Sequence, residues 1–231
     1  MDKNIFLIVF LVNSVLPAAH SHAKTIGKVQ HIEQAFVDVK TVYTKAMRGS
    51  NKTVSYERNG TGVIIDPSGL IATNKHTVVH APLIFVVFKD GTKMEAKIVH
   101  VSKKYDLCFL KINPRFALNT VALADSSKLR REESIMVVGG SRQNHHKFLP
   151  GKITRVINDQ STGTTEFLEV NLNLQRGDSG SPVLDQHGRL LGMITAKRKN
   201  QERSVFALSS DKIREQYALY KNTHAKITRR P

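Results

Sequence analysis

Short runs of β-branched and aromatic residues, separated by turn signals, recur along this chain and constrain its fold more than any other feature. The stretch Asp66-Pro67-Ser68-Gly69 and the pair Asp90-Gly91 are typical of turns that join antiparallel strands. Runs of this length and spacing predict an all-β protein of the barrel type. The 231 residues are enough for one unit of two barrels with a sizeable core.

Two sets of six such runs predict two six-stranded antiparallel β-barrels. The first barrel is expected at about 36–113, with strands at 36–43, 62–65, 70–73, 83–88, 93–101 and 107–112. The second is expected at about 127–210, with strands at 135–138, 148–157, 167–174, 182–184, 190–196 and 205–208. Three further segments complete the expected fold: a short helix over 28–34, a polar loop over 45–59 and a short C-terminal helix over about 211–220.

The Gly-Asp-Ser-Gly stretch at 177–180 is the strongest chemical signal in the sequence. A serine that attacks a carbonyl stands on a tight turn with backbone N–H groups aimed at the developing oxyanion, and glycine permits such a turn. Alone, the motif can equally be an ordinary loop. His76 and Asp106 lie upstream of Ser179, and His, Asp, Ser is one of the chain orders in which catalytic triads occur. Together the three residues predict a serine protease.

The first 23 residues predict a cleaved secretory signal. An apolar run at 5–15 is too short to span a bilayer comfortably, and the small-x-small sequence ending at Ala23 fits a cleavage site. The alternative is a buried N-terminal helix. We therefore expect the signal to be cleaved after Ala23, which leaves one mature domain at 24–231. This domain is expected to be periplasmic or secreted and to have no transmembrane anchor.

The chain is strongly basic, with a formal net charge of +16. The basic residues are scattered, aromatic residues make up only 6% of the chain and tryptophan is absent, which disfavours a dedicated nucleic-acid reader. Two interpretations remain open: a solvated basic surface, or attraction to anionic surfaces and acidic substrates. The single cysteine, Cys108, excludes an internal disulfide and is expected to be a small buried hydrophobe. His145, His146 and His187 show no metal-ligand spacing, so neither a metal nor a cofactor is expected.

Four further segments match one known pattern in the same order along the chain. Residues 60–76 resemble a histidine region, 106–112 an aspartate strand, 124–130 an inter-barrel segment and 205–208 a strand beside a substrate pocket. All four resemble the corresponding segments of the HtrA/Deg family of trypsin-like proteases. The resemblance extends from about Phe36 to Tyr220 and implies a two-barrel trypsin-like fold with the active site between the barrels.

Chemistry and resemblance together imply the role of each site residue. Ser179 would be the nucleophile, His76 the general base and then the acid, and Asp106 the group that orients the imidazole. The N–H groups of Gly177 and Ser179 would form the oxyanion hole. The expected activity is endopeptidase cleavage of proteins or peptides through an acyl-enzyme intermediate. The alternative is a non-catalytic trypsin-fold protein that binds anionic surfaces or partners.

The substrate pocket is expected at the ends of two strands near the nucleophile. Its walls would be Thr195, Ala196, Lys197, Ser204 and Phe206. An apolar wall at Phe206 favours small or aliphatic side chains, whereas the basic run that begins at Lys197 favours acidic ones nearby. Both interpretations remain open.

The chain departs from the HtrA/Deg pattern at three points. These proteins commonly carry a PDZ domain after the protease, and only residues 221–231 follow the last expected helix here, so PDZ-dependent behaviour is not implied. Asp178 stands where the family usually has asparagine, and we expect it either to pair with an internal base or to be solvated. The nucleophile region also resembles that of secreted glutamyl endopeptidases, but the histidine that those enzymes use is absent from 193–195, which leaves glutamate specificity unsupported.

Overall fold

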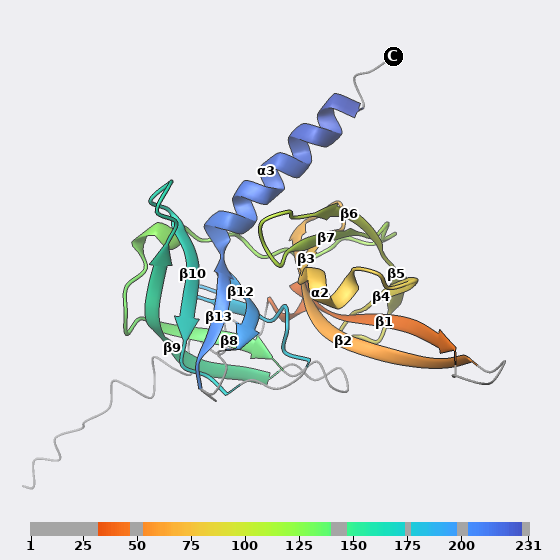
Figure 1. Cartoon of the computed structure of the whole chain (residues 1–231), viewed down its shortest axis with the longest axis horizontal. Coiled ribbons are helices and arrows are strands. Elements are labelled where there is room, and N and C mark those ends of the chain that lie inside the picture. Colours follow the sequence, from red (N-terminus) through yellow and green to blue (C-terminus); the bar gives the residue numbers. More distant parts are fainter. Residues whose placement is uncertain (1–31, 47–52, 140–146, 174–176, 198–202, 228–231) are drawn as a thin grey trace, which may run out of the picture.

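The computed structural model describes residues 32–46, 53–139, 147–173, 177–197 and 203–227. Within these ranges two β-sheets lie side by side, and one long helix, α3 (Ser210–Ile227), leans from the second sheet toward the first (Figure 1). The expected secretory signal lies outside the described residues, as does most of the expected helix at 28–34, of which the described part forms the short 3-10 helix η1 (Glu33–Ala35). None of the described helices is both long and apolar enough to cross a membrane.

The first sheet contains seven antiparallel strands in the order β5-β4-β1-β2-β3-β7-β6. The expected strand at 93–101 is split at Ala96, whose N–H donates to the Ile84 carbonyl (2.9 Å), and this accounts for seven strands in place of six. The strands are β1 (Phe36–Ala46), β2 (Thr53–Asp66), β3 (Leu70–Thr73), β4 (Leu83–Val87), β5 (Lys93–Glu95), β6 (Lys97–Val101) and β7 (Cys108–Lys111).

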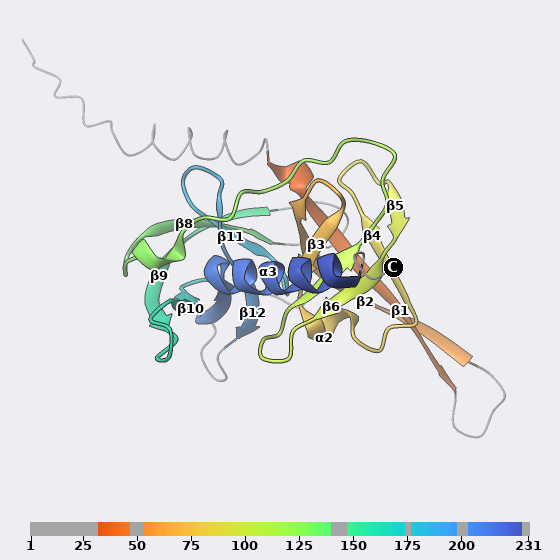
Figure 2. The ribbon, with the colours of Figure 1, turned by 90° about the horizontal axis from the view of Figure 1, so that it is seen from above.

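The expected polar loop at 45–59 is wrong, because most of it belongs to a long hairpin of β1 and β2. The two strands stay paired from Phe36↔Val63 out to Ala46↔Thr53, and the hairpin extends away from the body of the molecule (Figures 1 and 2). Residues 53–59 are exposed, so they lack the alternation of buried and exposed side chains that marks a strand in sequence. The ladder to β1 holds this segment extended.

The second sheet closes into a six-stranded barrel in the order β10-β13-β12-β11-β8-β9, as expected from the sequence. Each of its strands overlaps one of the six predicted runs. They are β8 (Ser134–Gly139), β9 (Lys147–Asn158), β10 (Thr165–Val170), β11 (Pro182–Leu184), β12 (Leu190–Lys197) and β13 (Val205–Ser209).

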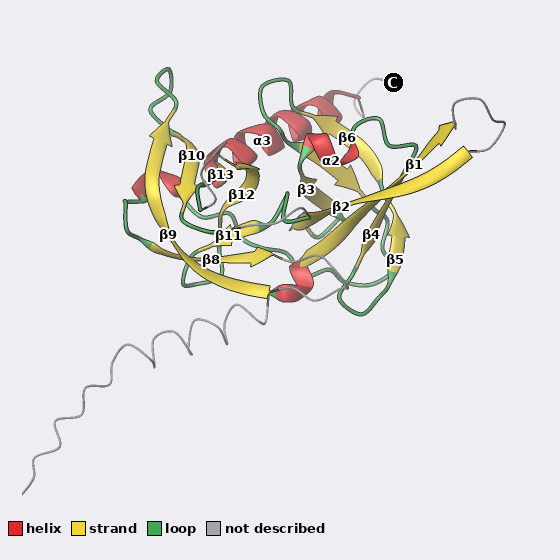
Figure 3. Cartoon of the chain, turned by 60° about the horizontal axis from the view of Figure 1, so that its bottom comes forward, coloured by secondary structure: helices red, strands yellow, loops and turns green. Residues whose placement is uncertain are grey.

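Helix α3 is longer than the predicted 211–220 and contacts both sheets. Apart from it the described helices are short (Figure 3). Its Gln216 lies 3.2 Å from His100 of β6, and the ring of its Tyr217 packs edge-on against Phe109 of β7. Ile213 is completely buried between the helix and the sheets. The helix therefore links the second barrel to the strands of the first sheet.

Three apolar clusters form the core and hold the sheets as one body. One fills the first sheet, one fills the closed barrel, and the third joins side chains of both sheets, including Phe36, Phe109, Met136, Leu184 and Leu208. Burial on this scale contributes about 25 cal/mol for each Å² of apolar surface removed from water. Because the third cluster is shared, residues from the two sheets keep a fixed relative position.

Candidate active site

The three residues expected to form a catalytic triad meet where the two sheets face each other. His76 lies in the short helix α2 (Lys75–Val78) after β3, Asp106 in the turn between β6 and β7, and Ser179 in the turn before β11. The imidazole Nδ1 of His76 is 2.6 Å from Asp106 Oδ2, and its Nε2 is 3.2 Å from Ser179 Oγ. The His76 side chain is 52% exposed, so a substrate can reach this chain of polar contacts.

Three hydrogen bonds hold Asp106 in place besides its contact with the imidazole ring. The His76 N–H donates to Oδ1 (2.9 Å), the Thr195 hydroxyl donates to Oδ2 (2.9 Å), and the Asn74 side-chain amide donates to the Asp106 carbonyl oxygen (3.1 Å). Burial raises the pKa of Asp106, but the hydrogen bonds from His76 and Thr195 outweigh it and leave the pKa below its ordinary value. The carboxylate is therefore charged and oriented toward the imidazole.

The Ser179 turn depends on glycine at the position that follows the serine. Gly180 has φ +86°, and a Cβ added there would lie 2.0 Å from the Thr61 carbonyl oxygen. Two backbone bonds fix the turn: the Thr61 N–H donates to the Ser179 carbonyl (2.8 Å), and the Gly180 N–H donates to that of Ile194 (2.9 Å). Gly177, at φ +105°, lies in the same turn, so the two expected oxyanion-hole residues, Gly177 and Ser179, belong to one turn.

The expected pocket residues lie on neighbouring strand ends. Ala196 pairs with Phe206 across β12 and β13, and the Ser204 hydroxyl donates to the Glu169 carboxylate. Lys197 is exposed on the same strand end, and the rest of its basic run lies outside the described residues.

Thr195, one of the expected pocket residues, donates its hydroxyl to Asp106 Oδ2. The sequence reasoning missed this positioning contact. In the sequence Thr195 follows Met193 and Ile194 as an ordinary residue of a predicted strand, and this pattern does not reveal where its hydroxyl points.

The family model for the trypsin-like peptidase domain matches residues 60–193, which include His76, Asp106 and Ser179. The chain belongs to this family. Among curated relatives, it is 30% identical over 138 residues to a probable periplasmic serine endoprotease DegP-like of Bartonella henselae, covering 59% of this chain and 27% of that protein. It is 28% identical over 167 residues to serine endoprotease DegS of Salmonella typhimurium, covering 71% and 47%. For the periplasmic pH-dependent serine endoprotease DegQ of Escherichia coli the identity is 30% over 144 residues, covering 61% and 32%.

The chain thus spans between about a quarter and a half of the length of these relatives. Among solved structures, the HtrA-type protease AlgW with a decapeptide superposes with a TM-score of 0.73, covering 87% of this chain and 67% of AlgW at 20% identity. This likeness confirms the expected trypsin-like fold. The curated relatives and this structure also confirm the resemblance to the HtrA type of trypsin-like protease.

Asp178 is the residue that stands where the HtrA/Deg resemblance implies asparagine. The residue is only 7% exposed, so the alternative in which Asp178 is solvated is wrong. It lies against Gly139, where an added Cβ would be 3.1 Å from Asp178 Oδ1. The absence of a side chain at Gly139 therefore makes room for this carboxylate behind the Ser179 turn.

Cys108, in β7 close to Asp106, is not a second nucleophile. It is completely buried, and burial followed by the nearby Asp106 charge raises the pKa of its thiol to about 12. The His187 backbone N–H donates to the Asp185 carboxylate (2.8 Å), and His145 and His146 lie outside the described residues. In the part of the chain that the structure describes, no three His, Cys, Asp or Glu side chains are placed to hold a metal ion together.

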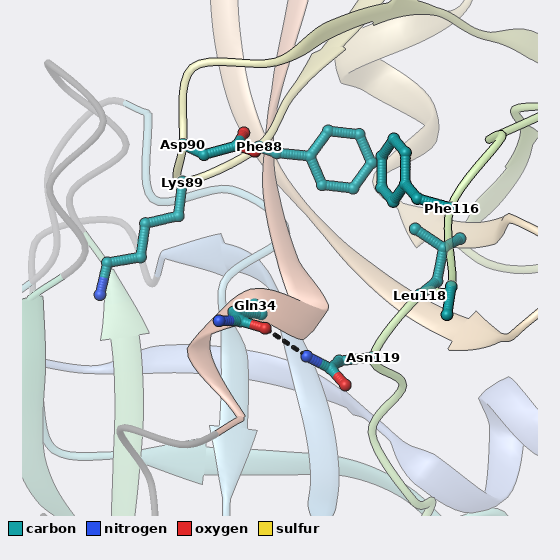
Figure 4. A pocket seen from close by; sticks show the side chains of 8 residues that line it. Gln34, Phe88, Lys89, Asp90, Phe116, Leu118 and Asn119 are labelled. Atoms are coloured by element: carbon teal, nitrogen blue, oxygen red, sulfur yellow. Dashed lines mark hydrogen bonds between the residues drawn. The ribbon is translucent and has the colours of Figure 1, made fainter.

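A cavity of about 460 Å³ lies beside the first sheet, away from the expected catalytic residues (Figure 4). Phe88 and Phe116 meet there edge to face, with ring centroids 5.5 Å apart, and the Asn119 amide donates to Gln34. No residue of the expected triad or substrate pocket lines it. The lining consists of Gln34, Phe88, Lys89, Asp90, Phe116, Ala117, Leu118 and Asn119.

Proposed function

We propose that this protein is an HtrA-type serine endopeptidase that works through Ser179, His76 and Asp106. The observation that carries the proposal is the continuous chain of contacts from Ser179 Oγ through the imidazole to the Asp106 carboxylate. Serine, histidine and aspartate in this connectivity are the parts that acyl transfer requires: a nucleophile, a base and a group that orients the base. The serine endoprotease names of the curated relatives support the same activity.

In the proposed reaction Ser179 Oγ attacks the scissile carbonyl while His76 Nε2 takes the hydroxyl proton. Asp106 stabilises the imidazolium that forms, and the N–H groups of Gly177 and Ser179 receive the oxyanion. His76 then gives its proton to the leaving amine, and the acyl group stays on Ser179. Water then gives a proton to His76 and attacks this ester; the acyl group leaves as a carboxylic acid, and the proton on His76 returns to Ser179 Oγ.

The test compares Ser179→Ala with Ser181→Ala, two truncations in neighbouring positions. The Ser181 hydroxyl is buried and makes no hydrogen bond within the described residues, so its loss should leave hydrolysis near the wild-type rate. Loss of Ser179 should abolish turnover of an unfolded protein substrate, since removal of a triad serine costs about a million-fold. A fluorophosphonate probe should label the wild type and Ser181→Ala at Ser179. An unlabelled, inactive wild type would instead favour the non-catalytic binding protein.

We further propose that the enzyme acts in the periplasm or after secretion. The periplasmic DegP-like and DegQ relatives support this location, and the leader-like sequence up to Ala23 supports export. N-terminal sequencing of the protein recovered from cells should read from Lys24. A chain recovered from the cytoplasm with its first residues intact would refute export.

A further inference from the structure

Strand β2 presents an unpaired backbone edge that begins next to the nucleophile. The N–H of Thr61 donates to the Ser179 carbonyl (2.8 Å), and its own carbonyl accepts from the Thr73 hydroxyl (2.9 Å). Both main-chain groups of Thr61 therefore point away from β1. Backbone groups alternate between the two edges of a strand, so those of Asn59, Glu57 and Ser55 share the edge that faces Ser179. The opposite edge is used by β1, as the bond from Thr41 Oγ1 to the Arg58 carbonyl also shows (3.3 Å).

No strand in the described part of the chain covers this edge. The neighbouring strand β3 pairs with β2 only from Val63 to Asp66. Residues 53–59 are exposed, and the hairpin that carries them extends beyond the body of the molecule (Figure 2). An exposed edge of this kind is a template for a further strand. We call residues 53–59, on the edge that faces Ser179, the free edge.

A fixed positive charge stands beside the free edge, on the side of α2. The Tyr43 hydroxyl donates to the carbonyl of Thr77, the residue after His76 (3.4 Å), and the Tyr43 ring stacks on that of Tyr56 with centroids 5.2 Å apart. The guanidinium of Arg58 lies over both rings, 4.8 Å from the Tyr43 centroid and 5.9 Å from that of Tyr56. Within the described residues Arg58 makes no ion pair, so its charge is available to a bound molecule.

We propose that the free edge binds the part of a protein substrate that follows the scissile bond, as an added antiparallel strand, and that Arg58 selects acidic side chains in that part. This inference rests on the proposed endopeptidase function. The substrate chain would leave Ser179 and run along β2 from Thr61 toward Thr53. Its main chain would bond to the groups at Asn59 and Glu57, and a side chain on the α2 side would lie beside Arg58.

Both the geometry and the charge favour this occupant over an unrelated partner. The free edge starts at the turn that holds the nucleophile: a Cβ placed at Gly60 would be 3.3 Å from the Ser179 carbonyl oxygen. A chain positioned for attack by Ser179 is thereby delivered to the first groups of the edge. An acidic segment matches Arg58 and the net charge of +16. Main-chain bonds would supply affinity without regard to sequence, and the arginine would supply the preference.

The test uses internally quenched peptides that are identical up to the scissile bond and carry Glu, Gln or Lys at one of the next four positions. We expect the wild type to cleave at least one Glu peptide with a higher kcat/KM than the matching Gln peptide. Arg58→Gln should reduce this Glu/Gln ratio by about two- to fivefold at low salt, the range for an exposed ion pair. Arg58→Glu should invert the preference toward Lys. The differences should shrink as salt rises.

Lys93→Gln is the matched control, because Lys93 is also a cation held over a ring of the first sheet, 3.9 Å from the Phe85 centroid, but on β5. Its Glu/Gln ratio should equal that of the wild type. The main-chain part of the proposal is tested by Glu57→Pro, which removes one N–H from the free edge and leaves the ladder to β1 intact. This variant should lose activity on peptides with four residues after the scissile bond relative to peptides with one.

The failure of this inference is distinguishable from that of the proposed function. A wild type that cleaves an ester substrate ending at the scissile bond is a serine hydrolase whatever the free edge does. If it does so, and the Glu/Gln ratio is the same in wild type and Arg58→Gln at all four positions, then Arg58 does not select substrates. Equal relative losses of Glu57→Pro on long and short peptides would likewise exclude strand addition.

Discussion

The hydrogen bond from Thr195 to Asp106 gives the sharpest prediction about the site. Thr195→Val keeps the shape of the side chain but removes the hydroxyl that donates to Asp106 Oδ2 (2.9 Å). A hydrogen bond to a charged group contributes about 1.5–3 kcal/mol, which corresponds to about ten- to 150-fold if all of it were expressed in the rate. Because the bond exists before the reaction as well as during it, we expect the lower end: kcat falls about tenfold and KM changes little.

The pH profile provides a second readout of the same variant. The Thr195 bond is one of the contacts that keep the pKa of Asp106 low against the effect of burial, so its loss should raise that pKa. The pH profile of the Asp106 carboxylate, followed by infrared spectroscopy, should therefore be shifted to higher pH in Thr195→Val relative to the wild type. Thr195→Ser keeps a hydroxyl and should restore most of kcat and the profile. If Thr195→Val matched the wild type in kcat and pH profile while Ser179→Ala was inactive, Thr195 would have no part in positioning Asp106.

Three further outcomes follow from other contacts. Hydrogen bonds from Ser161 and then from Lys104 and Lys212 hold the pKa of Asp159 far below its ordinary 3.8. The stabilisation that these contacts give is present above about pH 4 and is lost as the pH falls through the folded-state pKa. The difference in unfolding free energy between wild type and Asp159→Asn, measured in urea melts, should therefore become smaller in acid. The Cys108 thiol, with its pKa at about 12, should resist a disulfide reagent in the native protein and react fully once urea unfolds the chain. Gly180→Ala should lower the melting temperature far more than Gly91→Ala, because both positions have positive φ but nothing lies within 4 Å of a Cβ at Gly91; equal melting temperatures would show that the clash with Thr61 relaxes freely.

The closed barrel could be predicted strand by strand because its strands are short apolar runs bounded by turn residues. The run at 182–184 was predicted with the bounds that β11 has. The β1–β2 hairpin could not be predicted in this way, because a strand with exposed side chains on both faces has no alternation to detect. Its extended form depends on pairing with β1, from Val42↔Glu57 to Ala46↔Thr53, which no local pattern encodes.

The residues of the candidate site also differ in how far the sequence predicts them. His76, Asp106 and Ser179 stand in motifs whose residue types already suggest their chemistry, and the structure brings these three side chains together. Thr195 lies 89 positions from Asp106 in sequence and on the other sheet, so its contact exists only once the sheets pack. The sequence does not single out Arg58 for a related reason, because its position over two tyrosines arises only when the hairpin forms.

The division of the proposed catalytic residues between the sheets has a consequence for the newly made chain. His76 and Asp106 lie on the side of the first sheet, whereas Ser179 lies on the side of the second. The shared apolar cluster and the hydrogen bonds across the sheets, such as that from the Thr61 N–H to the Ser179 carbonyl, fix one side against the other. A chain with a single folded sheet holds either a base without a nucleophile or a serine without a base. Under the proposed mechanism, docking of the sheets is the step that completes the hydrolytic site, so copies that are still folding cannot digest one another.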